Sequence, residues 1–180
     1  MNPAEALPQP AGDAAELHQL HHEAQSFLFH EAELLDDGHL HGWFQLLTPD
    51  VDYRIPVRVT RERSAGKSPF SQTAFHMIED WGSLKVRVDR FDSEFALSED
   101  PPSRTRRLVS NVRVERGALD ELSVKSNILV FRAHRESPAS LLAAERRDTL
   151  RRVEGGLKLA KRLVLLDHTA LPTHNLAIFL

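Results

Sequence analysis

The hydrophobic period of the chain changes near position 50, and this change constrains the fold more than any other feature. Before it, Leu17, Leu20 and Ala24 begin a series of three- and four-residue steps that predicts one amphipathic helix. The helix is expected to start at Asp13 and to end at Gly38. Beyond position 50, apolar and polar residues alternate as they do in half-buried strands. Helices followed by strands predict an α+β fold.

Alternation marks the predicted strands of the C-terminal part. The stretches are Val51–Val57, Leu108–Val114, Leu122–Val130, Ala143–Val153 and Leu157–Leu165. Short polar turns join several of them, and Glu154-Gly155-Gly156 is a strong hairpin signal. Because hairpins connect antiparallel neighbours, we expect a curved antiparallel sheet wrapped around the N-terminal helices.

Local signals refine this prediction. A second, short helix is expected within His39–Leu47, followed by a break in the chain at Thr48-Pro49-Asp50. A polar loop is expected over Thr60–Gln72, and Asp80 is expected to cap a helix that carries Trp81 on its apolar face. In the strand that starts at Leu108, the pattern assigns four side chains to one face: Leu108, Ser110, Val112 and Val114.

Length, charge and cysteine content exclude several classes of protein. The 180 residues suit one domain, which we place at 13–180 after a flexible leader at 1–12. The net charge of −3 argues against nucleic-acid binding, and no apolar run has the ~20 residues of a membrane span. The absence of cysteine excludes a disulfide framework, a zinc finger and any iron–sulfur cluster ligated by this chain. We expect a cytoplasmic protein.

A metal site is weakly indicated. His18 and His22 are four residues apart, so both imidazoles lie on one helix face, but no third ligand follows at a suitable spacing. Further ligands would have to come from the tertiary fold: His30, Glu31, His39 and His41. A solvated helix face is the favoured interpretation, and the chain is expected to hold no metal or cofactor.

Acid–base chemistry is a second alternative. Asp36, Asp37, Tyr53 and His76 could line a cavity between the helices and the sheet, where burial shifts the pKa of a titratable group. Asp36-Asp37-Gly38 equally suits an exposed helix end. A stand-alone isomerase or dehydratase acting on a small molecule is therefore retained as an alternative function.

The densest charge cluster joins Glu99 and Asp100 to Arg104, Arg106 and Arg107. Alternation along a strand places Arg104 and Arg106 on one face and Arg107 on the other, which divides the cluster. No aromatic platform accompanies it, so ion pairing within or between subunits fits better than contact with phosphate.

Several stretches of the sequence resemble the small (β) subunit of bacterial aromatic-ring-hydroxylating dioxygenases, the terminal oxygenase components of Rieske non-haem iron systems. The resemblance is sharpest over Glu99–Val112 and covers nearly everything after Ala24. Its other main stretches are Phe29–Asp36, Trp43–Tyr53, Arg147–Arg152 and Ala160–Arg162.

Membership of this family implies a cone-shaped fold of the NTF2-like (cystatin-like) superfamily and a large (α) subunit as partner, commonly three of each in an α3β3 complex. It implies that the α subunit carries the Rieske 2Fe–2S cluster and the mononuclear iron. Electrons would come from NAD(P)H through a reductase and often a ferredoxin. The complex would convert an aromatic hydrocarbon or aromatic acid to a cis-dihydrodiol with O2.

The resemblance assigns no catalytic, cofactor or metal role to any residue of this chain, so the expected function is that of a structural subunit. The candidates for subunit contacts or structural support are Trp81, Glu99, Asp100, Arg104, Arg106, Arg107, Arg147 and Asp148. In addition, the apolar segment Leu176–Leu180 is expected to be buried, since five apolar residues in a row make an exposed end adhesive.

Overall fold

The computed structural model describes residues 14–60, 66, 68–92, 101–172 and 176–180. Its elements, in chain order, are α1 (Ala14–Asp36), α2 (Leu40–Phe44), β1 (Leu47–Arg58), β2 (Phe70–Glu79), α3 (Trp81–Phe91), β3 (Arg104–Arg116), β4 (Glu121–Ala133), β5 (Ser140–Val153) and β6 (Gly156–Leu166). The predicted leader at 1–12 lies outside the described residues, as do Glu99 and Asp100.

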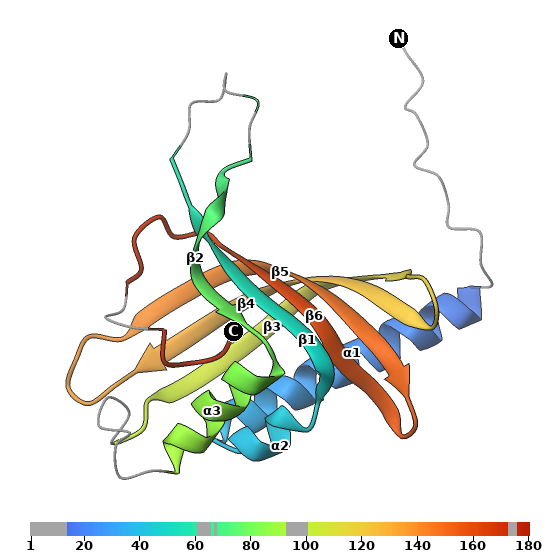
Figure 1. Ribbon diagram of the computed structural model, residues 1–180, viewed down its shortest axis with the longest axis horizontal. Helices are drawn as coiled ribbons and strands as arrows, with labels where there is room; N and C mark the ends of the chain where they lie inside the picture. The colour runs from blue at the N-terminus through green and yellow to red at the C-terminus, as the bar shows by residue number, and fades with distance from the viewer. Residues whose placement is uncertain (1–13, 61–65, 67, 93–100, 173–175) are drawn as a thin grey trace.

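The six strands form one curved sheet with the order β2-β1-β6-β5-β4-β3, and the helices pack against it (Figure 1). The long helix α1 crosses the sheet, and α2 and α3 lie together near the end of α1 (Figure 1). The predicted α+β class and the curved sheet around N-terminal helices are thus confirmed.

One strand pair departs from the predicted antiparallel arrangement. β1 and β6 are parallel, whereas the other neighbours in the sheet are antiparallel. The cause is the connection through α3, which brings the chain back so that β3 runs in the same direction as β2. The hairpins from β3 to β6 then place β6 beside β1 with the same direction.

Regular patterning accounts for most of the core. The stripe of α1 is buried at Leu20, Ala24 and Leu28, as its spacing predicts. The strand β4 alternates without interruption, with Leu122 and Val130 among its buried side chains. These faces meet in one hydrophobic cluster between the helices and the concave side of the sheet.

One predicted boundary is wrong because β1 is longer than expected, and β2 was not among the predicted strands. β1 already begins at Leu47, so Thr48-Pro49-Asp50 lies inside a strand and does not break the chain. The register between β1 and β6 shifts between Leu47 and Asp52, and this irregularity accommodates a proline that cannot donate to the ladder. β2 begins at Phe70, within the predicted loop Thr60–Gln72.

The face assignment in β3 is wrong for a related reason. Leu108 is 57% exposed and Ser110 is exposed, whereas Val112 is buried. Asn111 has a φ of 52° at a register shift between Ser110 and Arg113. Before this shift the odd-numbered residues of β3 face the core, and after it the even-numbered residues do. A one-residue bulge of this kind leaves the hydrophobic pattern looking continuous.

A similar shift affects β6, where Ala160 is an extra residue between the paired positions Leu159 and Lys161. After it, Arg162 and Val164 face the core instead of Leu163. The bulge therefore turns a charged side chain into the interior.

The two remaining expectations for the described helices and tail are confirmed. Asp80 caps α3 by accepting a hydrogen bond from the main-chain nitrogen of Ser83 at 2.8 Å. The apolar end of the chain lies within the body (Figure 1), where Ile178, Phe179 and Leu180 are at most 8% exposed. Among the described helices, none is long and apolar enough to cross a membrane.

Candidate functional site

The curved sheet and the helices packed on its concave side enclose a space that we call the cone. Four charged side chains meet inside it and form a buried network. Glu31 comes from α1, Arg146 and Asp148 from β5, and Arg162 from β6, and none is more than 3% exposed. The alternation of β5 points Arg146 and Asp148 inward, and the bulge in β6 points Arg162 toward them. Two positive and two negative charges balance, as buried ions require.

Arg162 is the centre of this network. Its Nη1 and Nη2 donate to the two carboxylate oxygens of Glu31 at 2.6 and 2.8 Å. Its Nε and Nη2 donate to the two oxygens of Asp148 at 2.9 and 2.8 Å. Arg146 adds a bond of 3.1 Å to Glu31, and the indole nitrogen of Trp43 adds another of 3.1 Å. One guanidinium thus joins α1 to two strands by paired, charge-assisted hydrogen bonds.

The electrostatics keep Glu31 ionised. Burial raises the pKa of its carboxyl group, but the charges of Arg162 and Arg146 outweigh that effect and hold the pKa at about 2 instead of the usual 4.5. Because the folded-state pKa is the lower one, the ionised carboxylate stabilises the fold fully above pH 4.5, and this contribution is lost as the pH falls toward 2.

Acid unfolding tests this arrangement. Between about pH 4.5 and 2, wild type should lose about 3 kcal/mol of unfolding free energy through Glu31 alone. The Glu31→Gln variant, which has no proton to take up at this position, should lose less over the same range. Urea titrations at a series of pH values measure the difference, and equal slopes for the two proteins would contradict the assignment.

Of the residues proposed for acid–base chemistry, Tyr53 and Asp36 are engaged by other partners. Tyr53 is 0% exposed, and its hydroxyl donates to the carbonyl oxygen of Leu180 at 2.7 Å. Asp36 accepts hydrogen bonds from Thr105 and from Arg107. His76 lies on β2, and in the described part of the chain no hydrogen bond joins it to Asp36 or Tyr53.

The possible metal ligands are similarly dispersed. Glu31 points into the core, while His30 is exposed and lies 3.9 Å from Glu33. His41 contacts Asp92 at 2.6 Å on the surface. Within the described ranges, no group of three or more histidine and acidic side chains is placed to hold a metal ion.

The arginines of β3 separate as the alternation predicts. Arg107 turns inward, has a side chain only 2% exposed, and is paired with Asp36, which also accepts from the Arg107 main-chain nitrogen at 2.8 Å. Arg106 is 71% exposed and lies 3.9 Å from Asp37. Arg104 is also exposed. Arg107 therefore attaches the end of α1 to the edge strand, and Arg104 and Arg106 remain on the surface.

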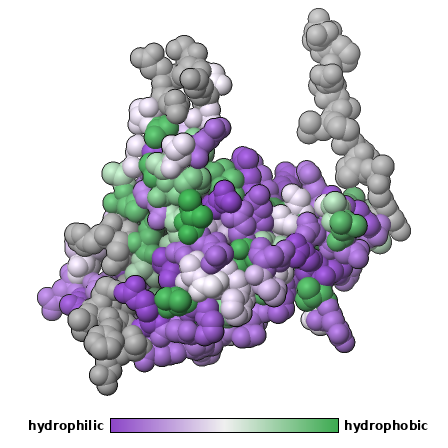
Figure 2. Space-filling model, in the orientation of Figure 1, coloured by the Kyte–Doolittle hydropathy of each residue, from purple (hydrophilic) through white to green (hydrophobic). Residues whose placement is uncertain are grey.

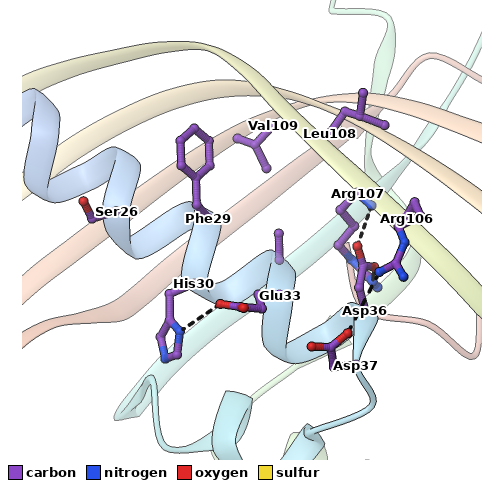
Figure 3. Close-up of a pocket in the computed structure, with 11 residues that line it drawn as sticks. Ser26, Phe29, His30, Glu33, Asp36, Asp37, Arg106, Arg107, Leu108 and Val109 are labelled. Atoms are coloured by element: carbon purple, nitrogen blue, oxygen red, sulfur yellow. Dashed lines mark hydrogen bonds and ion pairs between the residues drawn. The ribbon is translucent and has the colours of Figure 1, made fainter.

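A groove of about 920 Å³ runs between α1 and β3, next to these ion pairs (Figure 3). Phe29 and Val109 line it along one part, and Asp36 and Asp37 line it near the end of α1 (Figure 3). Phe29 is 51% exposed. The groove is open and its charges are already paired, which suits contact with another surface better than enclosure of a substrate.

An apolar surface lies on the outer face of the sheet. We call it the sheet patch, and it comprises Leu108, Leu129, Phe131 and Leu141, which are 37–57% exposed. Leu108 pairs with Leu129 across β3 and β4, and Phe131 pairs with Leu141 across β4 and β5, so the four side chains are neighbours. Contiguous exposed apolar groups of this kind mark interaction surfaces.

The remaining predicted contact residues have different positions. Arg147 lies on the same outer face, 59% exposed, with its Nε 2.8 Å from Glu145. Trp81 is 37% exposed and packs against Phe44, with ring centroids 5.0 Å apart. Apolar residues gather on the surface over β2 (Figure 2), where Ile78 is 58% exposed. Asp148 is a core residue.

Arg146 and Arg162 were not predicted as site residues, and Glu31 was predicted only as a possible metal ligand. Two signals were present. Glu31 continues the buried stripe of α1, four residues before Leu35, and Arg146 and Asp148 occupy inward positions of an alternating strand. For Arg162 no such signal exists, because the bulge at Ala160 reverses its face.

A curved sheet around N-terminal helices defines the NTF2-like class of folds, and a comparison with solved structures agrees. A putative scytalone dehydratase from Novosphingobium aromaticivorans shares this fold at 15% identity, with a TM-score of 0.63 over 86% of this chain and 89% of that one. The chain of a naphthalene 1,2-dioxygenase with indole bound in its active site matches better, with a TM-score of 0.81 and 28% identity over 96% of this chain and 95% of that one.

Sequence comparison assigns the family. Residues 30–173 match the family described as ring hydroxylating beta subunit. The chain is also 37% identical over 178 residues to the chlorobenzene dioxygenase subunit beta of Cupriavidus sp. (strain PS12), covering 96% of this chain and 94% of that protein. The chain belongs to the family of ring-hydroxylating beta subunits, the small subunits of aromatic-ring dioxygenases, and a large oxygenase subunit is its implied partner. The stand-alone isomerase or dehydratase is not supported.

Proposed function

We propose that this chain is the structural subunit of an aromatic-ring-hydroxylating dioxygenase and contributes no group to the chemistry. The structural interactions that occupy the centre of the cone carry this proposal. The space between helices and sheet holds the Glu31–Arg162 network, Trp43, Tyr53 and the buried end of the chain. Each polar group that acid–base chemistry at Tyr53 or Asp36 would need is engaged in holding the fold.

The redox chemistry then belongs to the large subunit. The Rieske 2Fe–2S cluster and the mononuclear iron are assigned to that chain, with electrons delivered from NAD(P)H through a reductase and often a ferredoxin. The proposed assembly is α3β3 in the cytoplasm. The substrate class is an aromatic ring, in keeping with relatives named for chlorobenzene and benzene dioxygenases.

The sheet patch is proposed as a contact surface for the large subunit, with Arg104 and Arg106 beside it and Arg147 further along the same outer face. Exposed apolar side chains at the centre and arginines at the rim are the usual composition of a protein–protein interface. Trp81 and the acidic residues Glu99 and Asp100 are kept as further contact candidates.

Charge insertion into the patch tests this function. Phe131→Glu should leave the subunit folded, since the side chain is already 39% exposed, but should reduce the recovered hetero-oligomer about tenfold or more. Co-expression with the large subunit, followed by size-exclusion chromatography with light scattering, measures assembly. Turnover per iron in the complex that remains should be unchanged.

Leu119→Glu is the matched control, because Leu119 is 95% exposed in the turn before β4 and lies outside the patch. Its assembly should equal that of wild type. Normal assembly of Phe131→Glu would reject the patch as the contact surface, and a loss of turnover per iron without loss of complex would contradict the structural role.

A further inference from the structure

The segment Leu176–Leu180 is held inside the cone in the manner of a bound peptide. Guanidinium groups from three elements donate to its main-chain carbonyl oxygens. Arg87 of α3 binds Leu176 at 2.8 Å, Arg107 of β3 binds Phe179 at 2.6 Å, and Arg162 of β6 binds Leu180 at 3.1 Å. The hydroxyl of Tyr53 also accepts from the nitrogen of Leu180 at 2.9 Å. Side chains of the body, more than strand pairing, therefore fix this segment.

The side chain of Phe179 occupies a defined aromatic site. Its ring stacks on Trp43, with centroids 4.1 Å apart and planes inclined by 25°. The guanidinium of Arg87 lies 5.2 Å from the centroid of the same ring. Stacking on another aromatic ring and proximity to a cation both stabilise an aromatic ring. Both residues that contact this ring belong to helices, Trp43 to α2 and Arg87 to α3. The indole of Trp43 is held in place by its hydrogen bond to Glu31.

We propose that Trp43 and Arg87 form a binding site for a small neutral aromatic ring, which Phe179 of the same chain occupies as a tethered ligand. Removal of the Phe179 ring should therefore convert the chain into a binder of small arenes such as toluene. A cavity of about 270 Å³ already adjoins Phe179, lined also by Leu35, Leu40 and Ile178, so space freed by removal of the ring would be continuous with it.

The charges around the site select for a neutral ligand. Arg87 is paired with Glu79 at 3.2 Å, Arg107 with Asp36, and Arg162 with Glu31 and Asp148. No arginine that holds the segment is thus left without an acidic partner. A carboxylate carried by the ligand would be buried without a compensating cation, so benzoate should bind far more weakly than toluene.

The test uses the full chain with Phe179→Ala and toluene as the probe. Thermal unfolding should show a lower Tm than wild type, and toluene at ten times its dissociation constant should raise that Tm by about 4 °C. Saturable quenching or shift of Trp43 fluorescence should give the same dissociation constant. Benzoate should bind at least about tenfold more weakly than toluene, and wild type should respond to neither.

Phe179→Leu is the matched control, because it removes the ring but keeps the site filled, and toluene should not shift its Tm. Adding Arg87→Met to Phe179→Ala should weaken toluene binding about three- to thirtyfold by removing the cation above the ring. If Phe179→Ala does not fold, Phe179→Val with benzene as probe makes the same comparison. Equal toluene responses of the alanine and leucine variants, or equal binding of benzoate, would overturn the proposal.

Discussion

The Arg162→Met variant is expected to unfold about 3–5 kcal/mol more easily than wild type. Methionine retains most of the side-chain volume, so the loss arises from charge and hydrogen bonding. Without Arg162, the carboxylates of Glu31 and Asp148 remain buried, and Asp148 loses both of the hydrogen bonds that Arg162 donates to it. Urea denaturation monitored by circular dichroism measures the change in unfolding free energy.

Lys161→Met is the matched control, since Lys161 is the exposed neighbour on the same strand. Its effect should be within about 0.5 kcal/mol of zero, as for most surface substitutions. Adding Glu31→Gln to Arg162→Met should recover part of the loss, because one uncompensated carboxylate is removed. A strictly additive double variant would show that Glu31 and Arg162 do not interact energetically.

The network also explains how one side chain can organise the whole cone. Arg162 joins α1 through Glu31, β5 through Asp148 and the end of the chain through Leu180. Hydrophobic burial alone would tolerate small shifts of α1 along the sheet, whereas paired hydrogen bonds define one position. The described structure thus uses these charged groups to hold helices, sheet and chain end together, and this supports a structural function over a catalytic one.

The sequence predicted those elements whose pattern is locally complete. The helix α1, the strand β4 and the helix α3 with its Asp80 cap each carry an uninterrupted period and a recognisable end. Alternation also predicted that Arg107 lies on the opposite face of the strand from Arg104 and Arg106, since no bulge separates them, but it did not predict which of the two faces is inward. In such segments, local sequence and tertiary packing favour the same structure.

The elements that could not be predicted depend on single extra residues or on distant pairing. The bulge at Asn111 and the extra residue Ala160 each reverse the face of the later residues in their strand, and neither position carries glycine or proline as a signal. The parallel pairing of β1 with β6 depends on the whole path of the chain. The network around Arg162 depends on the extra residue Ala160 and on distant pairing, since its partners come together only when α1, β5 and β6 are in place.

The Arg107→Glu variant is expected to lower the free energy of unfolding by about 3–5 kcal/mol, because it places a carboxylate against the buried carboxylate of Asp36. It also removes the hydrogen bond to the carbonyl of Phe179 and so weakens the hold on the buried end of the chain. Thermal unfolding of the isolated subunit should report the loss directly. In co-expression with the large subunit, complex should be lost in proportion to the subunit that fails to fold.

Arg106→Glu separates fold support from subunit contact, since it reverses the same charge one residue earlier on the same strand. Arg106 is 71% exposed, so the subunit should keep its Tm, and any loss of hetero-oligomer would come from the interface. Turnover per iron should be normal in whatever complex either variant forms. If Arg107→Glu keeps its Tm, the ion pair with Asp36 does not hold α1 to β3. If either variant assembles normally while turnover per iron collapses, β3 contributes to the active site or the electron path, and the structural function proposed for this chain is wrong.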